Sequence, residues 1–136
     1  MKQINQPRGL RNNNPGNIRT NSDRFAFEVR PSTDPAFKQF YTRAYGYRAM
    51  FVILRNYNRL YKLATLRQMI TRWAPPAEND TAAYIAAVSA SSGIPAEQPL
   101  DTADPEQMIP IVAAMSAVEN GCPALLSEVR KGWEAL

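Results

Sequence analysis

Residues 104–121 have the sequence DPEQMIPIVAAMSAVENG, and this stretch decides the fold. It opens with the signals of a helix start: an acidic cap at Asp104, a proline at the first helical position and an acid in the first turn. Apolar residues then occupy most of the helix circumference, and Gly121 suits the left-handed position that ends a helix. The stretch therefore predicts a buried central helix over about 105–119. Pro110 inside it predicts either a later start or a kink.

Further helices are expected around this one from the spacing of apolar residues. They are predicted over about 44–60, over 66–73 with Thr65 as N-cap, after a cap at Asn79, Asp80 or Thr81 as far as Gly93, and over about 123–135. Residues 1–35 are instead rich in turn formers, and 25–30 is expected to pair with 36–40 as a hairpin. The expected fold class is mainly α with a small β-hairpin (α+β), as a single domain over 1–136.

The composition excludes several kinds of chemistry. The 136 residues include no histidine and one cysteine, Cys122, so there is no Ser-His-Asp or Cys-His pair, no HExxH zinc motif and no intrachain disulfide. Catalysis at neutral pH must rest on carboxylates, a lysine, a tyrosine or a cofactor brought from outside. We expect no metal site and no cofactor, and we interpret Cys122 as a small packed residue.

The chain is basic, with a formal charge of +4 and a pI near 9.5. This suits an anionic partner such as nucleic acid, a membrane surface or the bacterial cell wall, although a solvated basic surface explains it equally well. The basic residues form no run of five or six, so no nucleic-acid partner is expected. No stretch is apolar enough for a signal peptide or a membrane span, which predicts a protein made in the cytoplasm that something else must deliver if its target lies outside.

Glu119 is the strongest candidate for a catalytic residue. It lies at the C-terminal end of the predicted apolar helix, where the helix dipole and the apolar neighbours both disfavour a negative charge. A carboxylic acid that keeps its proton near neutral pH is what glycoside cleavage requires of a general acid. An ordinary exposed glutamate at a helix end fits the same spacing.

Segment 73–84 supplies candidates for binding a sugar. Aromatic faces can stack on sugar rings and polar groups can orient them, which singles out Trp73, Glu78, Asn79, Thr81 and Tyr84. Helix capping is the alternative explanation for the polar members of this set.

The N-terminal third supplies amides and a second carboxylate. Asn13, Asn14 and Asn17 lie beside a predicted tight turn, where they could bind N-acetyl groups or simply form the turn. Glu28 on the predicted hairpin could be a second carboxylate of the site, although an outward-facing strand glutamate is more common.

Several blocks of sequence resemble, in this order, a family of small phage and prophage proteins that are described as virion structural proteins or as proposed lysins. The blocks are RGLRNNNPGNIR at 8–19, Phe37 with Phe40, YGYRAM at 45–50, WAPPAENDT at 73–81 followed by Tyr84-Ile85, and VENG at 118–121. The resemblance covers nearly the whole chain, and it implies that phage structural proteins are among the possible partners.

A second resemblance implies a lysozyme-like core. Residues 113–121, AAMSAVENG, resemble the catalytic helix end of goose-type lysozymes and soluble lytic transglycosylases. Residues 78–88 resemble their Glu-Thr-x-x-Tyr-Val helix with two extra residues, and 13–18 faintly resembles a segment of bacterial glucosaminidases. In those enzymes the glutamate helix comes first, whereas here it follows the tyrosine helix. Either the lysozyme-like core is circularly permuted, or the likeness is coincidental.

The resemblance implies cleavage of peptidoglycan glycan strands by a muramidase or lytic transglycosylase. Glu119 would protonate the glycosidic oxygen, Thr81 and Tyr84 would orient the sugar or Glu119, and the asparagines at 13, 14 and 17 would contact acetamido groups. Trp73 would supply apolar contact or merely support the loop. The alternative is a non-catalytic phage virion structural or peptidoglycan-binding protein, in which Glu119 points into the core or a salt bridge. Either protein would act at the cell wall, in the periplasm, or as a virion component.

Overall fold

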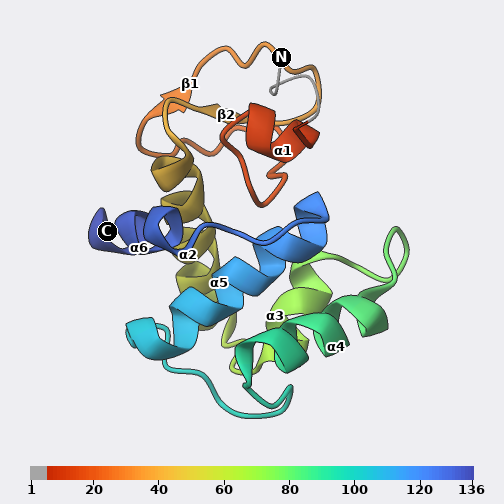
Figure 1. The fold of residues 1–136 in the computed structure, drawn as a ribbon. Helices are drawn as coiled ribbons and strands as arrows, with labels where there is room; N and C mark the ends of the chain where they lie inside the picture. The colour runs from red at the N-terminus through yellow and green to blue at the C-terminus, as the bar shows by residue number, and fades with distance from the viewer. Residues whose placement is uncertain (1–5) are drawn as a thin grey trace.

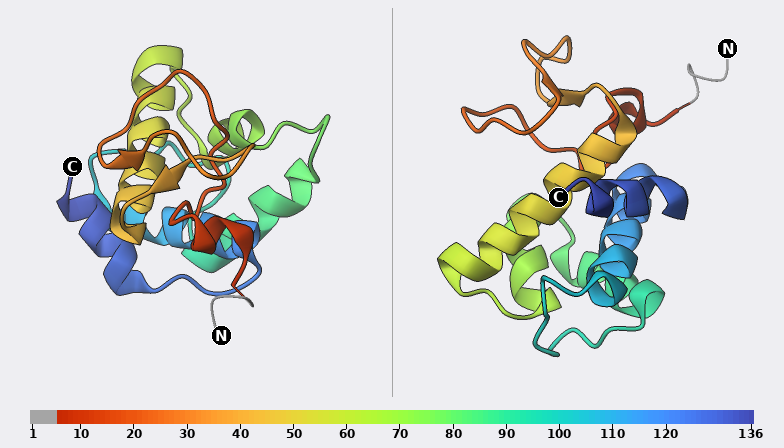
Figure 2. Two further views of the ribbon diagram at one scale, coloured as in Figure 1. Left: turned by 90° about the horizontal axis from the view of Figure 1, so that it is seen from above. Right: turned by 90° about the vertical axis from the view of Figure 1, so that its left-hand side faces the viewer.

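The computed structural model describes residues 6–136, and its architecture is mainly helical, with one small antiparallel sheet. Figure 1 shows a turn-rich N-terminal segment above a group of helices, and Figure 2 shows helix α2 leading from one to the other. The elements are α1 (Arg8–Arg11), β1 (Glu28–Val29), β2 (Gln39–Phe40), α2 (Arg43–Tyr61), α3 (Leu66–Trp73), α4 (Thr81–Ser92), α5 (Pro105–Asn120) and α6 (Leu126–Glu134). The predicted class is thus confirmed at the level of a helical chain with a small sheet. Of the turns predicted over 1–35, residues 1–5 lie outside the described residues.

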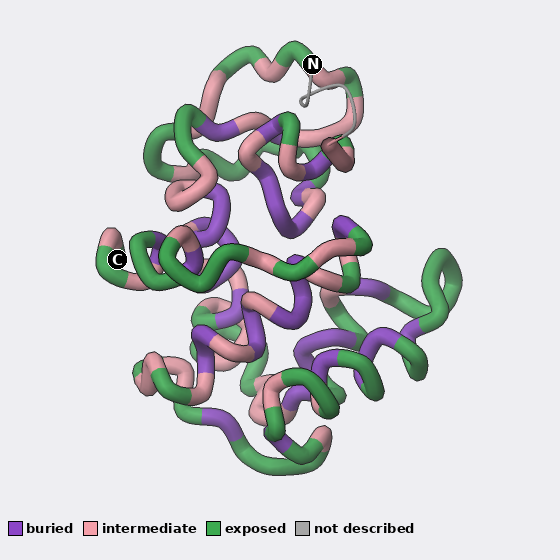
Figure 3. Tube along the Cα trace, in the orientation of Figure 1, coloured by how far each residue is buried: buried purple, intermediate pink, exposed green. Residues whose placement is uncertain are grey.

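Helix α5 runs through the core, as its apolar sequence predicts. At its start the Asp104 side chain accepts a hydrogen bond from the Glu106 amide, and at its end Gly121 adopts a φ of 69°. Its buried face packs against α2, α4 and α6, and Figure 3 shows buried positions along its length. Pro110 lies inside the helix, so it delays neither the start nor the capping. The last turn of this buried helix carries Glu119.

The neighbouring helices begin near the predicted residues because their caps are local. Thr65 and Gln68 form a reciprocal capping box at the start of α3, and Asp80 caps α4 by accepting from the Ala83 amide at 3.1 Å. Helix α6 begins later than predicted, at Leu126, without a side-chain cap. Within residues 6–136 no helix is both long and apolar enough to cross a membrane.

The hairpin is present but shorter than predicted. Glu28 pairs with Phe40 and Val29 with Gln39, while residues 25–27 are not part of the strand. Phe27 has a left-handed φ of 55°, which breaks the extended backbone, and its ring packs at 4.3 Å from that of Tyr45. The one-turn helix α1 was not expected, because four residues are too few for a periodic pattern.

Candidate functional site

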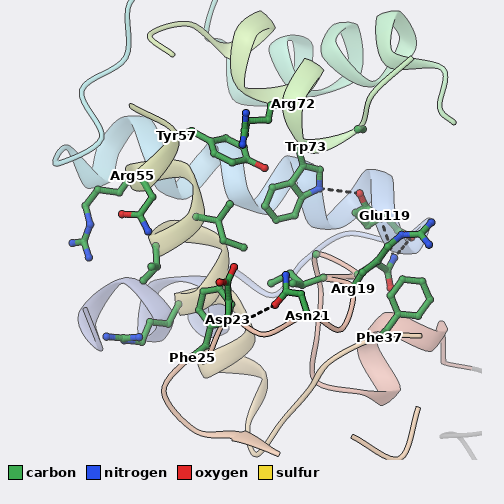
Figure 4. A pocket seen from close by; sticks show the side chains of 18 of the residues that line it. Arg19, Asn21, Asp23, Phe25, Phe37, Arg55, Tyr57, Arg72, Trp73 and Glu119 are labelled. Carbon is green, nitrogen blue, oxygen red and sulfur yellow. Dashed lines mark hydrogen bonds between the residues drawn. The ribbon is translucent and has the colours of Figure 1, made fainter. Parts of the chain in front are cut away.

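A cleft of about 1060 Å³ runs beside Glu119. Its walls come from loop 16–26 together with Phe37, from the face of α2 between Arg48 and Tyr61, and from residues 72–79 at the end of α3 (Figure 4). This volume is at the upper end of the range for small-molecule sites, so the cleft suits a segment of a polymer.

Three side chains from distant parts of the chain hold the Glu119 carboxylate. Asn17 Nδ2 donates to Oε1 at 3.0 Å, Trp73 Nε1 donates to Oε2 at 3.2 Å and the Tyr84 hydroxyl donates to Oε2 at 2.9 Å. Glu119 is half-buried and lines the cleft, and it makes no ion pair within residues 6–136. The fold therefore brings together four residues that the sequence singled out separately.

The hydrogen bonds distinguish the two oxygens of this carboxylate. A carboxylate offers about four acceptor positions, two on each oxygen. Tyr84 and Trp73 occupy both positions on Oε2, whereas Asn17 occupies one on Oε1. Within the described part of the chain, the remaining position on Oε1 is the place where a proton or a ligand donor can bind.

The Tyr84 hydroxyl keeps its proton and therefore acts as a hydrogen-bond donor to Glu119. Its side chain is buried, and burial raises the pKa of its hydroxyl, which the neighbouring Glu119 charge raises further. Thr81, one turn earlier on α4, is also buried, and its hydroxyl donates to the Ala74 carbonyl oxygen at the end of α3. Thr81 thus fixes the start of α4, and with it the position of Tyr84.

Only one of the three predicted asparagines reaches the site. Asn14 is fully buried, and its amide nitrogen donates to the carbonyl oxygens of Ile18 and Lys38, both at 2.9 Å. Asn13 donates to the Phe40 carbonyl oxygen at 3.1 Å. These two residues form the turn and join it to β2, whereas Asn17 beside them points to Glu119.

The predicted acidic residues occupy different places. Glu28 does not line the cleft; its carboxylate accepts from Lys38 Nζ at 3.1 Å and from Arg30 at 3.3 Å. Because Lys38 is fully buried, Glu28 is the counter-ion that its charge requires. Glu78 and Asn79 are exposed and do line the cleft.

Asn120 is a site-building residue that the sequence reasoning missed. Its buried amide donates to the Pro15 carbonyl oxygen at 2.8 Å and to the Ser116 carbonyl oxygen at 2.9 Å, which fastens the N-terminal turn to the end of α5. Gly16 permits a second close approach, of the same turn to the end of α3, since a Cβ there would lie 2.8 Å from the Trp73 ring. Asn120 and Gly16 both lie in sequence blocks that were singled out above. Their contacts, with Pro15 and with Trp73, join distant parts of the chain and depend on the fold.

Asp23 is a second carboxylate in the cleft that was not predicted. It is exposed, and its backbone amide donates to Asn21 Oδ1 at 3.0 Å, which forms a local turn (Figure 4). Among residues 6–136 no three acidic or cysteine side chains gather into a group that could hold a metal ion.

Comparison with known proteins connects the chain to a phage. It is similar to Protein P5 of Pseudoalteromonas phage PM2, with 42% identity over 137 aligned residues that cover 97% of this chain and 84% of P5. No protein-family model matches the chain. At this coverage the alignment takes in nearly every segment that builds the cleft.

Proposed function

The chain belongs to the same family as Protein P5 of phage PM2, and from this premise we propose that it is a phage protein that cleaves the glycan strands of peptidoglycan with Glu119 as the general acid. One observation carries the proposal: a half-buried carboxylate at the end of an apolar helix lines a polymer-sized cleft, and three donors fix its orientation. Its place of action would be the cell wall, reached from the virion or from inside the host.

The chemistry needs a single carboxyl group. Glu119 gives its proton to the glycosidic oxygen, the bond from that oxygen to the anomeric carbon breaks, and an oxocarbenium-like centre forms. A hydroxyl of the same sugar or a water molecule then attacks this centre, and the proton that it loses returns to Glu119. Attack by the sugar's own hydroxyl gives an anhydro end, and attack by water gives a reducing end.

A lysozyme-like core with permuted connectivity is part of the proposal. Helix α4 packs against α5, and Tyr84 from the first reaches Glu119 at the end of the second at 2.9 Å. This is the contact that the resemblance to lytic transglycosylases implies, reached with the two helices in reversed chain order.

A second candidate function is a non-catalytic virion component or peptidoglycan-binding protein. The observation that favours it is that the Glu119 carboxylate already accepts hydrogen bonds from three side chains of the protein. A carboxylate held in this way can also serve to fasten the N-terminal turn, α3 and α4 to the end of α5.

Incubation of purified sacculi with the wild type and with Glu119→Gln separates these functions. Muropeptides released into solution are identified by mass spectrometry, and binding is measured by co-sedimentation. The proposal predicts release by the wild type and a fall of about 10²–10⁴-fold in the variant, with binding retained. Glu134→Gln, at an exposed position outside the cleft, is the matched control and should behave as the wild type.

Each other outcome of this experiment has a definite meaning. A wild type that binds sacculi but releases nothing supports the second candidate. Equal release by Glu119→Gln refutes the role of Glu119. A wild type that neither binds nor cleaves several wall types refutes both cleavage and peptidoglycan binding, and leaves only the virion component.

A further inference from the structure

The cleft extends from Glu119 to a group of arginines that the cleavage chemistry does not use. Five arginines line the cleft, against three acidic residues. In Figure 4, Arg55 and Arg72 lie on the far side of Trp73 from Glu119, with Arg72 next to Tyr57 and Arg55 farther along the cleft. This part of the cleft, formed by Arg55, Arg72 and the tyrosines at 57 and 61, is called here the arginine limb.

Arg72 is held against two tyrosine rings, and it also lies within hydrogen-bonding reach of the Tyr57 side chain. Its guanidinium lies 3.8 Å from the ring centroid of Tyr61 and 5.4 Å from that of Tyr57. Stacking of this kind fixes the plane of the guanidinium while its edge stays available for a bidentate partner.

Arg55 is available as well. It is exposed on the cleft face of α2, two turns beyond Arg48, whose Nε is already committed to the Ala135 carbonyl oxygen at 3.0 Å. Within residues 6–136, neither Arg55 nor Arg72 has a carboxylate oxygen within 4.0 Å. Each of these two guanidinium groups lines the cleft without a carboxylate partner, and planar carboxylates match the geometry of a guanidinium.

We propose that the arginine limb binds the carboxylates of the stem peptides that branch from the glycan strand, so that the substrate is peptide-bearing rather than bare glycan. The inference rests on the proposed function, because it takes the strand to lie across Glu119. In peptidoglycan the peptides branch from the sugar chain, which puts anionic groups beside the strand and not within it. A nucleic-acid strand would instead carry a negative phosphate at every unit. Those phosphates would lie against the negative carboxylates of Asp23, Glu78 and Glu119, which line the same cleft.

The test measures the affinity of a soluble peptidoglycan tetrasaccharide by calorimetry, with its stem peptides, with amidated stem peptides and without peptides. The binding protein is the Glu119→Gln variant, so that no sugar is cleaved. It should bind the peptide-bearing sugar about tenfold or more tightly than the other two, and adding Arg55→Gln and Arg72→Gln should remove that preference without weakening the binding of bare sugar. The charge-matched control adds Arg11→Gln and Arg130→Gln, at exposed positions outside the cleft, and should keep the preference.

The outcomes separate this inference from the proposed function. Equal affinity for all three sugars overturns the inference and leaves glycan binding intact. Absence of binding to any of them overturns both. Tighter binding of a single-stranded DNA oligonucleotide, lost in the Arg55→Gln and Arg72→Gln variant, overturns the inference in favour of a nucleic-acid ligand.

Discussion

Replacing Gly46 by alanine tests the contact that seats the N-terminal turn on helix α2. A Cβ at this position would lie 2.0 Å from the Asn13 carbonyl oxygen and 2.6 Å from Cδ of Pro15. Contacts to a Cβ atom shorter than 3.0 Å are essentially never seen, so the turn that carries Asn17 toward Glu119 would have to retreat by about 1 Å.

Two opposing effects set the magnitude. Intrinsic helix propensity alone makes Gly46→Ala stabilising by about 1 kcal/mol. Overpacking costs about 1–3 kcal/mol, and the upper end applies because the clashing atoms belong to the backbone of a turn that Asn13 fastens to the Phe40 carbonyl oxygen. The expected net loss is about 2 kcal/mol, or roughly 8 °C in Tm for a domain of this size.

Urea and thermal unfolding followed by circular dichroism measure this change. Gly132→Ala inside helix α6 is the comparison, because a Cβ there would also be crowded but less severely: it would lie 2.7 Å from the Ala44 carbonyl oxygen and from Cβ of Tyr47, and 2.9 Å from the Arg48 amide nitrogen, against 2.0 Å at position 46. Its loss should be clearly smaller than that of Gly46→Ala. A Gly46→Ala protein as stable as the wild type, or more stable, would refute the packing of the turn against α2.

Three other changes around the site and the N-terminal segment have measurable outcomes. Tyr84→Phe removes one hydrogen bond to the Glu119 carboxylate and should lower muropeptide release about 10- to 100-fold; unchanged release would show that this bond does not orient the acid. Because burial raises the pKa of Tyr84, the native state keeps this proton above pH 10 while the unfolded chain loses it. Stability therefore falls with a slope that rises toward about 1.4 kcal/mol per pH unit as the pH passes 11. Urea titrations between pH 10 and pH 11 should show that the unfolding free energy of Tyr84→Phe falls less steeply with pH than that of the wild type. The hydrogen bond from Arg8 lowers the pKa of Asp34, so the stabilisation that this carboxylate gives the fold is complete above about pH 5 and is lost as the pH falls below that value. Asp34→Asn should therefore lose less stability than the wild type between pH 4 and pH 2, and an equal loss would contradict the role of the pair. Asn120→Ala leaves the Pro15 carbonyl oxygen without its donor and should cost about 1–3 kcal/mol of unfolding free energy in urea, whereas a loss below about 0.5 kcal/mol would show that the turn is held without it.

Helix positions could be predicted because their determinants are local. Thr65 with Gln68, and Asp80 with the Ala83 amide, lie within three residues of each other, so the sequence displays both partners of each cap. The hairpin was overestimated because alternation of apolar residues does not reveal a backbone turn such as that at Phe27.

The candidate site was predicted in part, and the missing part is long-range. Glu119 and Tyr84 are singled out by their local sequence context, but Asn120 acts on Pro15, which is 105 residues earlier in the chain, and no spacing rule connects them. Glu28 was misplaced because a strand pattern does not show that the neighbouring Lys38 is buried and needs a counter-ion.

The grouping of arginines in the cleft is also a long-range feature. The sequence contains no run of basic residues, which predicts that nucleic acid is not a partner. The fold gathers five arginines into one cleft from the N-terminal loop, α2 and α3. Clustering in space does not require clustering in sequence, so this group could not be predicted from charge runs.

The most direct test of the account is a crystal structure of the Glu119→Gln variant with a peptidoglycan tetrasaccharide. The account predicts that the sugar lies in the cleft, with one glycosidic oxygen about 2.6–3.2 Å from the side chain at position 119, on the side of the position that Oε1 occupies. A tetrasaccharide bound outside the cleft, or lying in it with every glycosidic oxygen beyond hydrogen-bond reach of position 119, would contradict the assignment of Glu119 as the acid.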